Sequence, residues 1–428
     1  IERRLLKPLI GYDRHPKLEI TTPSTIVADD LTPSETVQLP KEYVLGIAIN
    51  GGSTTSHAAL LARALAIPAV TGLGDITSRV SPGETVLLDG TNGAITLNPD
   101  KATEADFAAL VKRQKDLAEE VASGVPAGTL KDGGEILIYA NIHPGVPIAG
   151  VKAYGARGIG LYRSEYLWLT NEVEPSEEEQ FEAYKAVLTG MEGKEVIIRT
   201  CDIGADKQID YFELPKEENP AMGMRALRIS LSRPGFFRTQ LRALYRASAY
   251  GNLGIMFPMV TSVWEVRETK KLIESVKKEL DAEGLPYSDH VEIGIMIETP
   301  AAAVLSDRLA KEVDFFSCGT NDLTQYTLAC DRQNNDLGRF YDPHHLSVVR
   351  LLKMVVENAH KNGVWVGICG ELGADLEMTE TFLAIGVDEL SVSPRAVLPL
   401  RNAVRNLDMS ESAAKICAAI DSDEAPLF

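Results

Sequence analysis

One histidine, His57, stands where a helix is expected to begin. It follows a run of glycine and small hydroxyl residues and precedes strong helix formers that stop at Pro68. Free backbone N–H groups at a helix N-terminus favour an anion, so a phosphate carried on this imidazole would be stabilised there. A neutral imidazole nitrogen is also a competent nucleophile. His57 therefore either carries a phosphoryl group or, as the simpler alternative, only caps a helix.

Four arginines occupy glycine- or asparagine-rich stretches at or just after expected strand ends: Arg163, Arg199, Arg225 and Arg332. Guanidinium groups bind phosphate and carboxylate in a bidentate manner. Any one of them could be a solvated ion-pair partner, but four that converge on one sheet edge predict a small, multiply anionic substrate.

Two carboxylates, Glu298 and Asp322, follow consecutive strand-like runs. A hard divalent cation such as Mg²⁺ could bridge them and a substrate phosphate. Each could equally be a structural carboxylate at a strand end, and the nearby arginines favour the metal.

Among the five cysteines, Cys369 is the one best placed to react, because it ends a strand-like run and is followed by glycine. Its thiol could donate or accept a proton. The other four, Cys201, Cys318, Cys330 and Cys417, are interpreted as packing residues. An odd number without a CxxC pair predicts neither a disulfide framework nor a zinc site and favours a reducing cytoplasm.

The elements that must position these residues are short apolar runs that alternate with amphipathic helices. Eight such runs over about 300 residues match the count and size of a (β/α)₈ barrel, with a doubly wound sheet as the alternative. In a barrel, the chemistry-bearing residues would all meet at the C-terminal rim. The runs are Ile136–Ala140, Gly158–Leu161, Val196–Ile198, Leu253–Phe257, Ile293–Ile297, Phe315–Cys318, Val364–Ile368 and Leu390–Val392.

The sequence pattern around His57 predicts a compact mixed α/β domain over residues 1–99. Its expected elements are an opening helix at Glu2–Ile10, strands at Thr25–Ala28 and Val44–Ile49, and a hairpin that joins Thr85–Asp89 to Ala94–Leu97. Residues 100–128 are predicted to form a linking helix with a flexible end, and residues 129–428 the barrel. Such a connection allows relative domain motion.

Composition limits the classes of partner. The chain has 428 residues and a net charge of −18, which disfavours binding to nucleic acid or anionic membrane through bulk electrostatics. No apolar run approaches the roughly 18 residues needed to span a bilayer, so membrane insertion is not expected.

Taken together, these residues resemble enzyme I of the phosphoenolpyruvate-dependent sugar phosphotransferase system over nearly the whole chain. Several blocks in the same order carry the resemblance: Val27–Ser34, Thr55-Ser56-His57, Gly158–Glu165, Asp202–Lys207, Asn219–Arg225, Ile255–Met259, Glu298–Ala301, Gly319–Tyr326 and Cys369–Leu372.

The resemblance implies that phosphoenolpyruvate binds at the barrel mouth with Mg²⁺ and that His57 attacks its phosphorus. It implies that Glu298 and Asp322 hold the metal and that Cys369 protonates the enolate to give pyruvate. The phosphohistidine then passes its group to a histidine-containing phosphocarrier protein, the first step of sugar uptake. A homodimer through the barrel is also implied. The substrate's phosphate and carboxylate fall to Arg163, Arg199, Arg225, Asn321 and Arg332.

Two departures from the family pattern stand out. The family writes Gly-Gly-x-Thr-Ser-His, whereas Gly51–His57 has a loop one residue longer or a serine, Ser53, in place of a glycine. The helical partner-binding insertion of the family is absent, and Ile1–Gly11 is interpreted as its exit helix, so a longer protein, plain or fused, is expected. Two rivals remain: a phosphoenolpyruvate synthase or pyruvate phosphate dikinase that lacks its ATP domain, and a non-catalytic phosphoenolpyruvate sensor.

Overall fold

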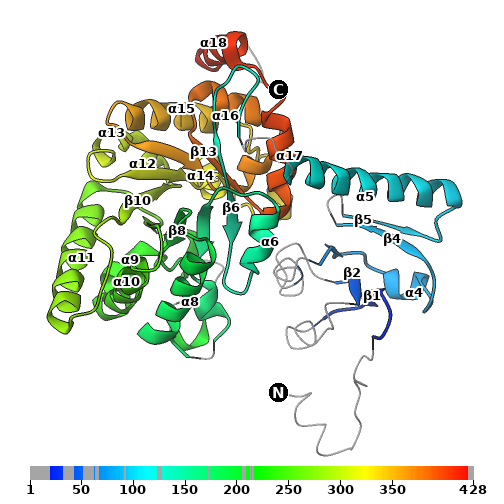
Figure 1. Ribbon diagram of the computed structural model, residues 1–428, viewed down its shortest axis with the longest axis horizontal. Coiled ribbons are helices and arrows are strands. Elements are labelled where there is room, and N and C mark those ends of the chain that lie inside the picture. The colour runs from blue at the N-terminus through cyan, green and yellow to red at the C-terminus, as the bar shows by residue number, and fades with distance from the viewer. Residues whose placement is uncertain are drawn as a thin grey trace, which may run out of the picture. The chain divides into compact units, whose positions relative to one another are not determined.

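A computed structural model describes the protein at residues 20–31, 43–51, 62, 67–90, 93–122, 128–171, 173–204, 209–212, 214 and 216–422. The chain divides into two compact units, Ile1–Asp116 and Leu117–Phe428 (Figure 1). His57, the helix expected to follow it apart from the buried, helical Ala62, and the opening helix at Glu2–Ile10 lie outside the described residues.

The first unit contains a parallel sheet in the order β1-β2-β3. The central strand β2 is the most apolar of the three, and Ile47, Ala48 and Ile49 are fully buried, as a strand covered on both faces requires. Both strands predicted here are confirmed. The sheet strands are β1 (Ser24–Ala28), β2 (Val44–Ile49) and β3 (Ala69–Val70), with the short helix α4 (Ile76–Arg79) beyond them.

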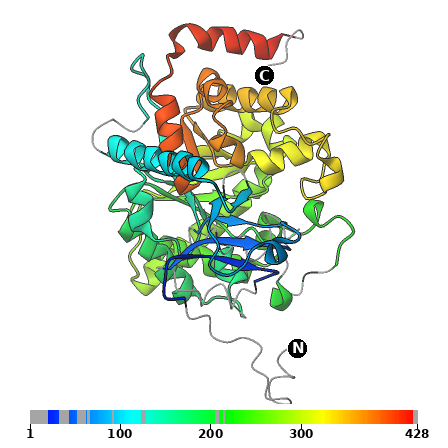
Figure 2. The same ribbon diagram turned by 90° about the vertical axis from the view of Figure 1, so that its right-hand side faces the viewer.

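The predicted hairpin is also present, as the antiparallel pair β4 (Val86–Asp89) and β5 (Ala94–Leu97). Gly93, just before β5, has a φ of +65°, a conformation that glycine adopts without the penalty of a Cβ atom. The long helix α5 (Lys101–Ala122) follows and agrees with the charged, amphipathic pattern of its sequence (Figure 2).

The second unit is a closed barrel of eight parallel strands, β6 to β13. This confirms the predicted (β/α)₈ barrel and excludes the doubly wound sheet. The strands are β6 (Leu137–Ile142), β7 (Ile159–Arg163), β8 (Val196–Arg199), β9 (Leu253–Phe257), β10 (Glu292–Ile297), β11 (Phe315–Cys318), β12 (Trp365–Ile368) and β13 (Glu389–Val392).

Helices surround these strands (Figure 1). They are α6 (Ile148–Ala153), α7 (Tyr166–Leu169), α8 (Glu177–Gly190), α9 (Leu227–Ser232), α10 (Pro234–Ser248), α11 (Val263–Glu283), α12 (Pro300–Val304), α13 (Ser306–Leu309), α14 (Thr320–Leu328), α15 (Leu346–His360), α16 (Thr379–Ile385), α17 (Pro394–Val404) and α18 (Met409–Asp421). Short 3₁₀ segments lie at η1 (Asp210–Phe212), η2 (Pro220–Met222), η3 (Asn335–Leu337) and η4 (Glu371–Ala374).

Alternation along the strands separates two packed regions. In β10, Ile293, Ile295 and Ile297 belong to the large core between strands and helices, whereas Met296 belongs to a smaller cluster of residues from several barrel strands. This period of two is the strand geometry that places successive side chains on opposite faces. Among the described residues, no helix is long and apolar enough to cross a bilayer.

Several strands run further than the sequence predicts. Asn141, Arg163 and Arg199, expected just past their strands, lie within β6, β7 and β8. Their polarity favours an earlier strand end. The carboxyl end of this barrel accepts polar side chains, however, because other charged groups there can pair with them.

Candidate active site

The predicted site residues of the barrel are brought together at its C-terminal rim. They meet there because the carboxyl ends of all eight parallel strands, and the loops that follow them, lie on one face of the barrel. Arg163 and Arg199 are the last residues of β7 and β8 and are paired in register. Glu298 follows β10, Asn321 and Asp322 lie in the first turn of α14, and Cys369 follows β12. Arg225 and Arg332 come from loops before α9 and after α14.

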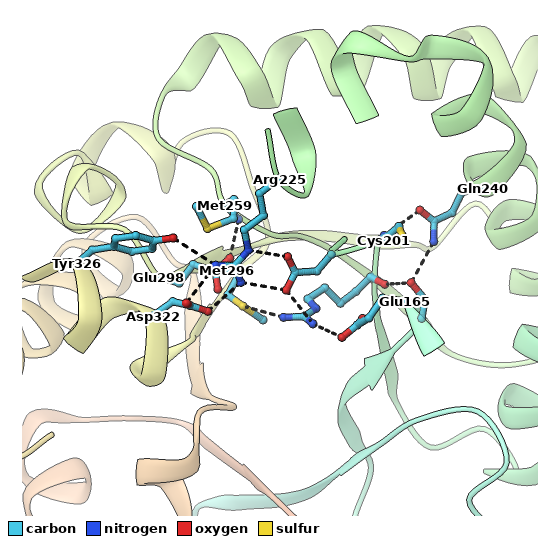
Figure 3. A network of polar contacts seen from close by, with 12 residues as sticks. Glu165, Cys201, Arg225, Gln240, Met259, Met296, Glu298, Asp322 and Tyr326 are labelled. Atoms are coloured by element: carbon cyan, nitrogen blue, oxygen red, sulfur yellow. Dashed lines mark hydrogen bonds and ion pairs between the residues drawn. The ribbon is translucent and has the colours of Figure 1, made fainter. Parts of the chain in front are cut away.

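Arg225 is the centre of the polar network (Figure 3). Its guanidinium donates to both carboxylate oxygens of Asp322, at 3.1 and 3.0 Å, and to both oxygens of Asp202, at 3.1 and 3.3 Å. The Tyr326 hydroxyl accepts a further bond from it at 3.2 Å. Burial disfavours the charge, yet the two carboxylates outweigh burial and raise the pKa of Arg225 well above its usual value. The guanidinium is a fixed cation in a buried site.

Arg199 is the second buried cation. Its Nη2 lies 2.6 Å from Glu165 Oε1 and 3.1 Å from Asp202 Oδ2, and Nη1 lies 3.7 Å from the Met296 sulfur. Burial again opposes the charge, and Glu165 and Asp202 overcome it and raise the pKa of Arg199. Asp202 thus holds both guanidiniums, so it fixes their spacing.

Glu298 is buried beside a backbone donor. Its Oε1 accepts the Met259 N–H at 2.6 Å, and Met259 has a φ of +57°, a strained conformation for a residue with a side chain. Burial, followed by repulsion from Asp322 and Asp202, raises the pKa of Glu298 to about 7. For Asp322, burial would raise the pKa, but the Arg225 charge prevails and lowers it. One carboxylate is thus firmly ionised and the other is poised near neutrality.

Cys369 is almost fully buried, and its thiol points to the Cys318 carbonyl at 3.7 Å. Burial raises the pKa of the Cys369 thiol to about 12, with opposing contributions from Ser317 and Arg199. At neutral pH the sulfur therefore carries its proton. A neutral thiol at the bottom of an arginine-lined site is suited to act as an acid.

The remaining three predicted residues form the outer part of the rim. Asn321 accepts the Glu371 N–H at 3.0 Å through Oδ1, which ties α14 to the segment after Cys369. Arg332 is exposed but lowers the pKa of Asp322 through its charge. Arg163 is half-buried. Burial lowers the pKa of His143, and the charge of Arg163 lowers it further.

Some residues of this network carry no role in the sequence-based prediction. Asp202, Glu165 and Tyr326 appear only within the blocks that carry the family resemblance, and Met296 is not mentioned. The spacing of Tyr326, four residues after Asp322 on α14, places both on one helix face and could have indicated it. Met296 has no such signal, because an interior methionine in a strand is the ordinary pattern for a core.

His57 lies outside the described residues, but the point where the chain enters its loop is described. Gly51 donates to the Asp29 carbonyl at 3.0 Å. The Asp29 carboxylate accepts bonds from Asn50 at 2.6 Å and from Thr77 at 2.7 Å. These bonds anchor the end of β2 where the histidine loop begins.

The sequence matches two family models over most of its length. Residues 118–409 match the PEP-binding domain of PEP-utilising enzymes, and residues 20–93 match the mobile domain of the same enzymes. Curated relatives named phosphoenolpyruvate-protein phosphotransferase align over nearly the whole chain. The protein of Streptococcus equinus is 45% identical over 96% of this chain and 72% of its own length. That of Listeria innocua gives the same figures, and that of Lactococcus lactis is 45% identical over 98% of this chain and 75% of its own.

Proposed function

The chain belongs to the phosphoenolpyruvate-protein phosphotransferases, and on that premise we propose how it acts: it moves the phosphoryl group of phosphoenolpyruvate to His57, releases pyruvate, and passes the group to a histidine-containing phosphocarrier protein. The observation that carries the proposal is the rim itself, where two buried guanidiniums, a poised carboxylate and a neutral thiol converge. Figure 3 shows Arg225 and Glu298 among these groups.

Phosphoenolpyruvate is a small anion with a phosphate and a carboxylate, and the rim offers cations for both. Arg199 and Arg225 remain charged at any physiological pH, and their forks suit phosphate oxygens. We assign the phosphate to these two and to Arg163, and the outer contacts to Asn321 and Arg332. Because Arg225 is bound to two carboxylates in this structure, substrate phosphate would replace part of that pairing rather than fill an unused donor.

The residues present fit Mg²⁺. Glu298 and Asp322 supply the hard oxygen ligands that the ion prefers, and repulsion between them contributes to the raised pKa of Glu298, which a cation would relieve. One or two carboxylates plus substrate phosphate is a common Mg²⁺ environment, so the lack of a group of three His, Cys, Asp or Glu ligands among the described residues is compatible with it. When bound, the ion would neutralise charge on the transferring phosphoryl group.

The reaction then needs a nucleophile and an acid. The His57 nitrogen forms a bond to phosphorus as the bond from phosphorus to the enol oxygen breaks, which leaves pyruvate enolate. The Cys369 S–H gives its proton to the methylene carbon of the enolate and completes pyruvate. Its high pKa keeps the proton in place until a strong base, the enolate carbon, is present.

The partners follow from the same proposal. We propose a cytoplasmic enzyme, a homodimer through the barrel, in which the domain over residues 1–99 carries His57 to the rim and then to the phosphocarrier. The dikinase and sensor alternatives lose support, because the relatives named phosphotransferases align over at least 96% of the chain.

Exchange of labelled carbon between pyruvate and phosphoenolpyruvate tests the function without a phosphocarrier. When the protein is incubated with Mg²⁺, phosphoenolpyruvate and [¹⁴C]pyruvate, ¹⁴C should move from pyruvate into phosphoenolpyruvate. Chelation of Mg²⁺ should stop this exchange. Label that fails to move, or that moves only when ATP is added, would overturn the proposal and point to dikinase chemistry.

A further inference from the structure

Glu389, the first residue of β13, is a fully buried carboxyl group to which the proposed reaction gives no role. None of its surface is exposed, and among the described residues neither carboxyl oxygen makes a hydrogen bond of normal geometry, although the Ser391 hydroxyl interacts with it. Ionisation of a buried carboxyl group with so little hydrogen bonding is strongly disfavoured, so the group is expected to be protonated or bridged by internal water. Such a group in a barrel core requires an explanation.

Two glycines make room for this side chain. A Cβ atom on Gly160 would lie 2.5 Å from Glu389 Oε1, and one on Gly367 would overlap Oε2. The carboxyl group therefore occupies the space that side chains of β7 and β12 would otherwise fill. The chain gives up two side chains in the barrel interior to hold one acid.

The carboxyl group lies close below the catalytic thiol. Gly367 pairs in register with Glu389, and Cys369 is two residues further along the chain, just past the end of β12, roughly 7 Å from Gly367 at the usual rise per residue. Ser317 pairs with the other side of Gly367. The Ser317 hydroxyl interacts with the Cys369 thiol and the Ser391 hydroxyl with Glu389. Both hydroxyls are buried and make no hydrogen bond of normal geometry among the described residues, so they are suited to bind water between the acid and the thiol.

A route to solvent leads the other way. Tyr139 pairs in register with Ser391, and its hydroxyl donates to Glu195 Oε2 at 2.8 Å. Glu195 is half-buried at the amino end of β8. The groups thus run in sequence from the amino end of the barrel to the rim: Glu195, Tyr139, Glu389 and Cys369.

We propose that Glu389 is the proton donor that restores the Cys369 thiol after each protonation of the enolate. The O–H bond of Glu389 breaks and an S–H bond forms at Cys369, directly or through one water molecule. The Glu389 carboxylate then takes the Tyr139 hydroxyl proton while Tyr139 takes a proton from protonated Glu195 in the same concerted step, so that no tyrosinate forms. For this step the Tyr139 hydroxyl turns from Glu195, to which it donates in the structure, toward Glu389, and Glu195 is reprotonated from solvent. No oxidant, reductant or further reactant is needed.

The electrostatics agree with this direction of transfer. Burial, followed by repulsion from Glu195, raises the pKa of Glu389 well above the usual carboxyl value against a smaller opposing contribution from Ser391, so the buried site favours the protonated form. Burial also raises the pKa of Glu195. A thiolate is ordinarily a much stronger base than a carboxylate, and burial raises the pKa of both Cys369 and Glu389, so the transfer runs from the carboxylic acid to the thiolate.

The test rests on the proposed function and compares two labels in one mixture. The full chain is incubated with Mg²⁺, phosphoenolpyruvate and pyruvate that carries ¹⁴C and a deuterated methyl group. Carbon exchange needs only that Cys369 gives and takes back its proton, whereas deuterium loss needs the thiol to exchange with solvent. With Glu389→Gln, carbon exchange should stay within about threefold and deuterium loss should fall about a hundredfold.

Controls separate this role from a structural one. Glu312→Gln changes a partly buried glutamate whose ion-pair partner is Arg267, outside the proposed route, and should leave the ratio of the two rates unchanged. Tyr139→Phe should lower the ratio in the same direction as Glu389→Gln, and it carries the test if that variant fails to fold. A ratio equal to the parent's, whether both rates fall or neither does, would overturn the inference. Absence of carbon exchange in the parent would instead overturn the proposed function.

Discussion

Replacement of Glu298 by glutamine should stabilise the metal-free protein. Glutamine imitates the protonated carboxyl group, and its amide oxygen can still accept the Met259 N–H. Burial and the neighbouring Asp322 and Asp202 raise the pKa of Glu298 from 4.5 to about 7, so the folded protein disfavours the ionised form. At 1.4 kcal/mol per pKa unit, this corresponds to a cost on the order of 3 kcal/mol above pH 7.

The pH dependence of this effect has a definite sign. A carboxyl whose pKa is raised on folding contributes no cost below its unfolded value, and its destabilisation grows as the pH rises from about 4.5 through about 7. Urea unfolding without metal should therefore give equal free energies of unfolding for Glu298→Gln and the parent near pH 4.5. At pH 8 the variant should be more stable. Glu411→Gln, an exposed change on α18, should shift stability by less than about 0.5 kcal/mol at either pH.

Added Mg²⁺ and phosphoenolpyruvate should reverse the order. A ligand that binds only the folded protein stabilises it by mass action, and the variant lacks one of the two proposed metal ligands. Carbon exchange should be lost in Glu298→Gln while it persists in Glu411→Gln. A variant that is no more stable than the parent at pH 8 without metal, or that exchanges carbon normally, would refute the reasoning about Glu298.

Three further substitutions test the rim. Cys369→Ala should still bind phosphoenolpyruvate by titration calorimetry but form pyruvate about a hundredfold or more slowly in rapid-quench experiments, and unchanged pyruvate formation would remove the thiol from the mechanism. Asp202→Asn should lower the free energy of unfolding by about 3 kcal/mol in urea, because it takes a buried carboxylate from both Arg199 and Arg225; a loss below about 1 kcal/mol would contradict this. Tyr326→Phe should raise KM for phosphoenolpyruvate about tenfold with little change in the melting temperature, since the hydroxyl orients Arg225, and an unchanged KM would exclude that role.

The barrel could be predicted because its strands are continuous apolar runs with polar residues at one end. Phe315–Cys318 and Leu253–Phe257 were placed to the residue, since each is bounded by polar or turn-forming residues. The ends of β7 and β8 were placed too early. Arg163 and Arg199 continue the ladder, and polarity alone cannot distinguish a strand residue that faces an active site from a residue in a loop.

The gathering of the rim residues could also be predicted, because parallel strands deliver their ends to one face. Their pairing could not. Asp202 holds two arginines through distances set by the β8 loop, and Met259 meets Glu298 through a strained backbone, and neither pattern repeats along the sequence. The buried position of Glu389 could not be predicted either, because a glutamate at the start of a strand is ordinarily solvated. Only the contacts with Gly160 and Gly367 on neighbouring strands show that its side chain points into the barrel.

The central claim is that His57 receives the phosphoryl group. Incubation of the full chain with phosphoenolpyruvate and Mg²⁺, followed by mass spectrometry at neutral to alkaline pH, tests it most directly. Our account predicts one phosphoryl group per chain, located on His57, lost on mild acid treatment and absent from His57→Ala. A protein that stays unmodified, or a His57→Ala variant that is phosphorylated as fully as the parent, would contradict the account.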